Sequence, residues 1–280
     1  LFHQPNFITY DLPIKNISSV HDLSWIHFPN FFSKNDLKTF DLYFEKSLEN
    51  STKIIVGCNF IKKELCNYFN IPATKVEVTY HDVRGDYNSL PEKNCLEFLN
   101  KFKLSYKNFF LIINTLDNRK NFDFILDVYD KLNSNIKNKY PLVIFGQRVH
   151  HSESIIKKID KIKNCFYFDY LDENLKNQCF SSAKIFFHPS LYEGFGISPL
   201  ESMASGTPVI ASDIESSKEI LGDNVILLDL NDELKWISKI GELLENQYLY
   251  KKIVTKALNH TLNFKKGSLI NQTLDIYKRI

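Results

Sequence analysis

Short apolar runs alternate with amphipathic stretches along most of the chain. The apolar runs predict strands at 53–57, 75–80, 109–114, 141–146, 166–171, 185–187, 209–211 and 224–229. Apolar side chains at helical spacing predict helices at 33–49, 59–69, 172–182, 215–221, 232–244, 248–262 and 268–280. Strands that alternate with helices in this way predict parallel sheets of the α/β class.

A glycine-rich loop follows the predicted strand 185–187. Gly194 and Gly196 let the backbone bend and approach a ligand closely. Ser198, Pro199 and Glu201 then form a helix start with the features of a capping box. A loop that leads into a helix start presents unpaired N–H groups and the positive end of the helix dipole, which suits a phosphate.

Two acids bracket this loop, Glu193 before it and Glu201 in the helix, with seven residues between them. Carboxylates repel a phosphate, so their natural partners are hydroxyl groups. A sugar beside one acid and a ribose beside the other describes a nucleotide-sugar. In the alternative interpretation, Glu201 only completes a capping box and Glu193 is a solvated loop acid.

The segment E-G-F-G-I-S-P-L-E, with H-P-S before it and M-A-S-G-T-P-V-I-A-S after it, resembles the E-x7-E signature of retaining glycosyltransferases of family 4. The resemblance implies the GT-B architecture, in which two Rossmann-like, doubly wound parallel-sheet domains face a cleft. It also implies that Glu193 holds hydroxyls of the donor sugar and that Glu201 holds the ribose. The donor-binding turn between them would comprise Gly194, Phe195, Gly196, Ile197 and Ser198.

A second basic segment fits the same resemblance. Arg119 and Lys120 follow the strand 109–114 and precede a helix, and family members use such cations to bind the donor diphosphate. The alternative is a pair of solvated surface cations. Relatives usually carry glycine where this chain has Asn114. Three residues at strand ends complete the expected donor site: Gly146, Tyr170 and Leu171. In relatives, the end of the strand that corresponds to 166–171 touches the nucleobase.

His21 is the candidate residue of the first domain. It lies in S-S-V-H-D at the end of a strand-like segment, and the resemblance places such a histidine at the ligand-binding edge of a doubly wound sheet. We expect it to contact the donor sugar or the acceptor, and a structural histidine beside Asp22 is the alternative. His81 stands where relatives usually have an Asn-Gly turn, so we treat it as part of an interdomain loop.

A chain of 280 residues predicts two domains. We expect residues 1–103 to form a partial N-terminal, acceptor-side domain, with the helix 268–280 packing back on it. Residues 104–267 would form the nucleotide-sugar-binding domain, and 84–94 a linker. The chain starts at Leu1, without the opening β-α units of the family. We therefore expect an incomplete first domain, an N-terminally truncated sequence and poor catalysis.

Composition narrows the function classes. With 44% hydrophobic and 24% charged residues the chain is globular, and a net charge of +2 argues against nucleic-acid binding. Five cysteines without C-x-x-C spacing indicate reduced thiols in a cytoplasmic protein. No apolar run is long enough to span a membrane. Scattered basic residues leave open a peripheral contact with the cytoplasmic face of the inner membrane.

The predicted reaction is transfer of a hexose, with mannose from GDP-mannose as the favoured donor, to a glycan or lipid-linked acceptor. The chain has no Asp-x-Asp, so we expect no metal and no cofactor, with Arg119, Lys120 and helix N–H groups stabilising the leaving diphosphate. The resemblance is greatest to bacterial mannosyl- and rhamnosyltransferases of surface polysaccharide synthesis. Two alternatives remain: a non-hydrolysing sugar-nucleotide epimerase of the same architecture, and a nucleotide-binding fragment without transfer activity.

Overall fold

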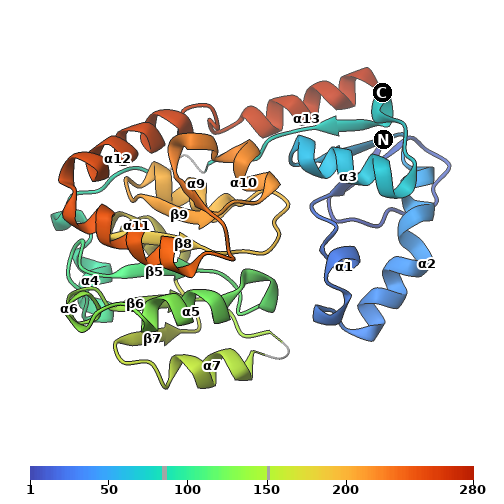
Figure 1. The fold of residues 1–280 in the computed structure, drawn as a ribbon. Coiled ribbons are helices and arrows are strands. Elements are labelled where there is room, and N and C mark those ends of the chain that lie inside the picture. The colour runs from blue at the N-terminus through green and yellow to red at the C-terminus, as the bar shows by residue number, and fades with distance from the viewer. Residues whose placement is uncertain (84–86, 150–151) are drawn as a thin grey trace. The chain divides into compact units, whose positions relative to one another are not determined.

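The chain divides into two compact units in the computed structural model (Figure 1), which describes residues 1–83, 87–149 and 152–280. The first unit comprises Leu1–Asp82, Tyr192–Gly196 and Phe264–Ile280. The second comprises Val83–Leu191 and Ile197–Asn263. Residues 84–86 of the predicted linker lie outside the described residues.

The described part of the first unit is built on a parallel sheet with strand order β1-β2-β3-β4. Its strands are β1 (Phe2–Gln4), β2 (Asn16–Val20), β3 (Lys53–Val56) and β4 (Val76–Val78), and its helices are α1 (Ser24–His27), η1 (Pro29–Phe31), α2 (Lys34–Asn50), α3 (Asn59–Phe69), η2 (Ala73–Lys75) and α13 (Ser268–Arg279). All five residues of β2 are buried, as expected for an inner parallel strand. Ser33 caps α2 by accepting a hydrogen bond from the Asp36 N–H at 3.1 Å.

Helix α13 packs on the first-unit sheet although it lies at the other end of the sequence. Its Ile276 forms a buried cluster with Ile17 of β2 and Ile55 of β3. The Asp82 carboxylate accepts hydrogen bonds from the N–H groups of Gly267, at 2.6 Å, and Leu269, at 2.8 Å. Asp82 therefore satisfies N–H groups at the start of α13, where a negative charge is favourable.

The described part of the second unit contains a wider parallel sheet with strand order β10-β9-β8-β5-β6-β7. These strands are β5 (Phe110–Ile113), β6 (Leu142–Phe145), β7 (Cys165–Phe168), β8 (Ile185–His188), β9 (Val209–Ser212) and β10 (Ile226–Leu228). The strand order reverses between β5 and β8, and the carboxyl ends of strands beside such a reversal are the usual ligand site of a doubly wound sheet.

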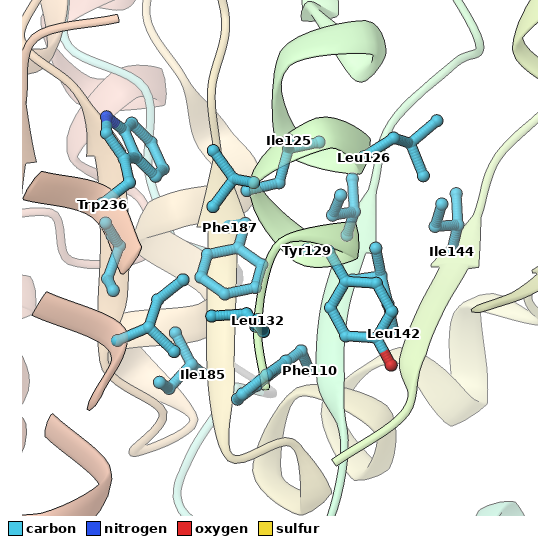
Figure 2. Close-up of a cluster of buried hydrophobic side chains, with 14 of the residues drawn as sticks. Phe110, Ile125, Leu126, Tyr129, Leu132, Leu142, Ile144, Ile185, Phe187 and Trp236 are labelled. Carbon is cyan, nitrogen blue, oxygen red and sulfur yellow. The ribbon is translucent and has the colours of Figure 1, made fainter. Parts of the chain in front are cut away.

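Helices cover both faces of this sheet. Helix α5 contacts α7 and α11, and α8 contacts α4 and α9. The bounds are α4 (Leu96–Phe102), α5 (Phe122–Asp130), α6 (Ser134–Lys139), α7 (Glu153–Ile159), α8 (Glu173–Ser182), α9 (Ile197–Ala204), α10 (Glu215–Ile220), α11 (Glu233–Glu245), α12 (Gln247–Thr261), η3 (Glu92–Asn94), η4 (Asn118–Lys120) and η5 (Gly222–Asn224). Figure 2 shows the aromatic core under α5, where Phe110, Phe187 and Trp236 are at most 1% exposed.

The observed division differs from the predicted boundary at residue 103. Residues from Val83 onward belong to the second unit, because the apolar face of α4 is buried there. Phe98 lies 6.0 Å from the ring of Phe145, and its N–H donates to Gln178 Oε1 at 3.1 Å. The short segment Tyr192–Gly196 belongs instead to the first unit, which the sequence did not indicate.

Candidate functional site

A cavity of about 350 Å³ opens at the carboxyl ends of β5, β6 and β7 in the second unit. It lies at the edge of the sheet where α/β proteins bind ligands, and its volume is within the range of small-molecule sites. Six predicted site residues line it: Arg119, Lys120, Gly146, Tyr170, Leu171 and Ser198.

The two cations are held by the single turn η4. The Asp117 side chain accepts a hydrogen bond from the Arg119 N–H at 2.8 Å, and the Asp117 carbonyl accepts one from the Lys120 N–H at 2.9 Å. The Arg119 carbonyl accepts from the Leu191 N–H at 2.9 Å, which ties the turn to the segment after β8. Two positive charges on a fixed backbone suit a diphosphate better than two freely moving surface cations would.

Gly146 lets β5 and β6 approach closely at the floor of this cavity. A Cβ at this position would lie 1.6 Å from the Asn114 carbonyl oxygen, so no larger residue fits. The Nδ2 of Asn114 is buried and has no hydrogen-bond partner within the described residues. Because buried polar groups are usually paired, Asn114 is a candidate ligand contact, whereas the sequence showed only a departure from the family glycine.

Two acidic side chains, Asp169 and Glu173, line the same cavity. Asp169 follows β7 and accepts hydrogen bonds from the Tyr167 hydroxyl and from the Arg148 Nε, the latter at 3.0 Å. These two hydrogen bonds, the one from Tyr167 first, lower the pKa of Asp169, so its carboxylate is ionised. Glu173, at the start of α8, also lines the cavity and pairs with Lys176 at 2.9 Å. Neither acid was a sequence candidate.

The central motif is divided between the two units. Ile197, Ser198 and Glu201 belong to α9 of the second unit, where Glu201 is buried. Helix α9 begins at Ile197, one residue before the predicted cap, so Ser198 lies in the first turn. In this position Ser198 is part of the cavity wall.

Glu193, Gly194, Phe195 and Gly196 lie in the first unit together with His21. A Cβ on Gly194 would lie 1.9 Å from the His21 carbonyl oxygen, so glycine is required for this approach. The Cys58 thiol donates to the Gly194 carbonyl at 3.0 Å, and Glu193 is buried. Gly196 has a φ of +87°, which favours glycine.

His21 is exposed, and its Nε2 donates a hydrogen bond to the Pro5 carbonyl at 2.8 Å. His21 therefore belongs to the same unit as the segment from Glu193 to Gly196. Arg119 and Lys120 line the second-unit cavity together with Ser198 and the strand-end residues.

In the parts of the chain that the structure describes, no group of three or more His, Cys, Asp or Glu side chains is arranged to hold a metal ion. Over the same residues, no helix has the length and apolar character needed to cross a bilayer. None of the five cysteines is in a disulfide.

Comparison with known proteins identifies similar chains. The family model for "Glycosyl transferases group 1" matches residues 97–260. The O-antigen chain mannosyltransferase B of Escherichia coli is 27% identical over 282 residues, covering 99% of this chain and 74% of that protein. The O-antigen chain mannosyltransferase RfbU of Salmonella typhimurium is 28% identical over 239 residues, covering 80% of this chain and 60% of that protein.

Solved structures confirm the predicted GT-B class. WaaG, described as a glycosyltransferase involved in lipopolysaccharide biosynthesis, superposes with a TM-score of 0.79 at 15% identity, covering 98% of this chain and 76% of that chain. Anabaena HepE in complex with UDP-glucose gives a TM-score of 0.76 at 15% identity, covering 95% of this chain and 72% of that chain. At these identities the similarity concerns the fold.

Proposed function

This chain belongs to the glycosyl transferases group 1 family and is a glycosyltransferase, and we propose that it transfers mannose from GDP-mannose to a glycan or lipid-linked saccharide. We propose further that the reaction retains the anomeric configuration and needs no metal. The names of the similar O-antigen mannosyltransferases support mannose as the transferred sugar.

The observation that carries this proposal is the second-unit cavity with Arg119 and Lys120 in its wall. Sugar transfer requires stabilisation of a departing nucleoside diphosphate, and positioned cations can supply it without reorganising during the reaction. Each charge-assisted hydrogen bond contributes about 1.5–3 kcal/mol. Ser198 lies in the first turn of α9, whose N-terminal end adds a favourable dipole for the same anion.

The two acids that line the same cavity, Asp169 and Glu173, favour guanine as the base. An ionised carboxylate only accepts hydrogen bonds, and guanine offers it two adjacent donors, N1–H and the N2 amino group. Uracil and thymine offer a single N3–H between two carbonyl oxygens that repel a carboxylate. We propose that Asp169 and Glu173, which both line the cavity, make this distinction.

The remaining predicted residues are assigned by the family resemblance. We propose that Glu193 holds the mannose hydroxyls, that Glu201 holds the ribose, and that His21 contacts the transferred sugar or the acceptor. Both glutamates are buried, and because acidic side chains are rarely buried unless they are paired, this supports specific binding partners for their carboxylates. We propose that the protein contacts the cytoplasmic face of the membrane peripherally and binds a lipid-linked acceptor there.

Calorimetric titration tests the nucleotide assignment. We expect the full chain to bind GDP more tightly than UDP or dTDP. Lys120→Ala should weaken GDP binding by about 10- to 150-fold, the equivalent of losing one charge-assisted hydrogen bond, and should leave guanosine binding nearly unchanged. Lys161→Ala is the matched control, because Lys161 is an exposed lysine of the same unit and does not line the cavity.

Equal losses for GDP and guanosine would show that Lys120 does not contact the diphosphate. Tighter binding of UDP than of GDP would contradict the role of Asp169 and Glu173. Product analysis with GDP-mannose alone tests the epimerase alternative, since an epimerase would convert the donor without any acceptor.

A further inference from the structure

The short segment Tyr192–Gly196 carries Glu193, the residue that we propose holds the mannose hydroxyls. It belongs to the first unit, whereas Leu191 before it and Ile197 after it belong to the second. The contacts that hold this segment in the first unit therefore decide where the Glu193 carboxylate lies. Those of its neighbour Tyr192 have no part in the reaction as proposed above.

The Tyr192 hydroxyl both donates and accepts a hydrogen bond inside the first unit. It donates to Glu64 Oε2 at 2.6 Å and accepts from the Leu23 N–H at 3.0 Å. Burial, followed by the hydrogen bond to Glu64, raises the pKa of Tyr192. The hydroxyl therefore keeps the proton that it donates to Glu64.

Glu64 receives this bond from helix α3, with a side chain that is only 13% exposed. Its other carboxyl oxygen, Oε1, lies 2.7 Å from His27 Nε2. Burying an acid is costly unless it is paired, and apolar side chains often stabilise a protein as well as a buried ion pair does. The stability of the fold is therefore a weak reason for an acid at this position, and the orientation of Tyr192 is a stronger one.

The ring of Tyr192 is enclosed as well as its hydroxyl. Its centroid lies 4.8 Å from that of His27, 5.8 Å from that of Phe60 and 6.2 Å from that of Phe28. Tyr192 itself is 6% exposed. A side chain that is held at both its ring and its hydroxyl leaves its backbone little freedom to move within the first unit.

The residues after Glu193 are held in the same unit. The Gly194 carbonyl accepts from the Cys58 thiol at 3.0 Å, and the Phe195 ring lies 4.8 Å from that of His81. Glu193 thus lies between neighbours that are fixed on both sides, and it is 7% exposed. Its carboxylate is aimed by the backbone on either side of it.

We propose that Glu64 and Tyr192 are positioning residues, whose hydrogen bond fixes the Glu193 carboxylate where it meets the hydroxyl groups of the transferred sugar. This inference rests on the proposed function, because it takes the sugar contact of Glu193 from there. Groups that hold a substrate act well only when their own supports are rigid, and a misplacement of about 1 Å is costly. The lost support should be felt by the sugar and not by GDP, which we propose binds in the second unit.

The test is calorimetric titration of the full chain with GDP-mannose and with GDP, and the readout is the ratio of the two dissociation constants. Tyr192→Phe keeps the ring and removes the hydroxyl, and Glu64→Leu removes both acceptor oxygens. Each should weaken GDP-mannose binding about tenfold relative to GDP, as expected for a lost hydrogen bond. The affinity for GDP itself should stay the same.

Two further variants separate positioning from a general loss of structure. Glu64→Gln keeps a carbonyl oxygen for the Tyr192 hydroxyl, so it should change the ratio less than Glu64→Leu does. Tyr192→Phe combined with Glu64→Leu should raise the ratio no further than the stronger single variant, because both remove the same hydrogen bond. If Tyr192→Phe does not fold, the comparison of Glu64→Leu with Glu64→Gln decides the outcome.

Tyr277→Phe is the matched control, because Tyr277 belongs to the first unit and its hydroxyl also bonds a side chain, that of His3. Ile276→Ala controls for stability. Ile276 is buried against Ile17 and Ile55 of the same unit, so its truncation leaves a cavity and lowers the melting temperature of that unit. Both variants should leave the ratio unchanged.

The inference is overturned if Tyr192→Phe and Glu64→Leu leave the ratio unchanged, or if Ile276→Ala raises it as much as they do. Glu193→Gln in the same assay separates this failure from failure of the proposed function. A ratio raised by Glu193→Gln but not by Tyr192→Phe would remove only the positioning role. A ratio unchanged by Glu193→Gln would remove the sugar contact, and the positioning role with it.

Discussion

The two units share a parallel α/β plan but differ in how their interiors are built. The second unit packs large aromatic side chains between its sheet and helices, including Phe110, Phe187 and Trp236. Among the described residues, the first unit has a narrower sheet, of four strands against six, and its aromatic rings pack between helices, with Trp25 of α1 stacked on Phe40 of α2 at 4.0 Å between centroids. The wider sheet of the second unit gives broader support to the charged groups that we propose hold a diphosphate.

The largest expected effect comes from the aromatic core of the second unit. Phe187 is fully buried in β8, with its ring 5.3 Å from that of Phe110. Phe187→Ala should lower the free energy of unfolding of this unit by about 3–5 kcal/mol, from lost burial and the cavity left behind. Thermal unfolding followed by calorimetry would show the second unit's transition at a lower temperature.

Phe166→Ala provides the control in the same sheet, because Phe166 of β7 is 46% exposed. Its truncation removes less buried surface and should have a much smaller effect. Equal destabilisation by the two changes would mean that the aromatic core does not account for the stability of this unit.

Gly194→Ala tests the first unit at the central motif. The added Cβ would lie 1.9 Å from the His21 carbonyl, so the backbone must shift, at an expected cost of about 1–3 kcal/mol. Sugar transfer should fall more steeply than GDP affinity, because Gly194 lies beside His21 and Glu193 and not in the second-unit cavity that we propose binds GDP.

Gly241→Ala in α11 is the matched change in the second unit. Nothing lies within 4 Å of its added Cβ, and alanine is the better helix former, so this variant should gain about 0.5–1 kcal/mol. If Gly194→Ala were equally well tolerated, the close approach to His21 would not constrain the motif.

Patterns in the sequence predicted the features that depend on neighbouring residues. The apolar runs predicted the approximate positions of the strands from β5 to β9. The segment around Arg119 and Lys120 was correctly expected between a strand and a helix. The resemblance carried by the motif around Glu193 predicted the GT-B class, which the family match and the solved structures confirm.

The features that the sequence did not predict depend on contacts between residues far apart in the chain. Tyr192 joins the first unit because its hydroxyl donates to Glu64 at 2.6 Å and accepts from the Leu23 N–H at 3.0 Å. These partners lie more than a hundred residues away in sequence. Asp82 accepts hydrogen bonds from the start of α13 across a similar separation. None of these contacts leaves a local pattern.

A smaller effect than that of Gly194→Ala is a difference in acid stability between the units, caused by His81. Its pKa is about 4 in the folded protein and near 6.5 as an ordinary imidazole. Between these values the unfolded chain binds more protons than the folded one, so the free energy of unfolding falls as the pH is lowered from 6.5 to 4. Because His81 is only half-buried, we expect a loss of about 1 kcal/mol, well below the full linkage value.

His81→Asn sharpens this last comparison, because asparagine keeps a donor and an acceptor but does not titrate. In denaturant unfolding across that pH range, the variant should lose less first-unit stability than the unaltered chain. The second-unit transition should respond in the same way in both proteins, since His81 belongs to the first unit. An unchanged acid response of the first unit would show that partial burial does not keep the His81 imidazole neutral in the folded protein.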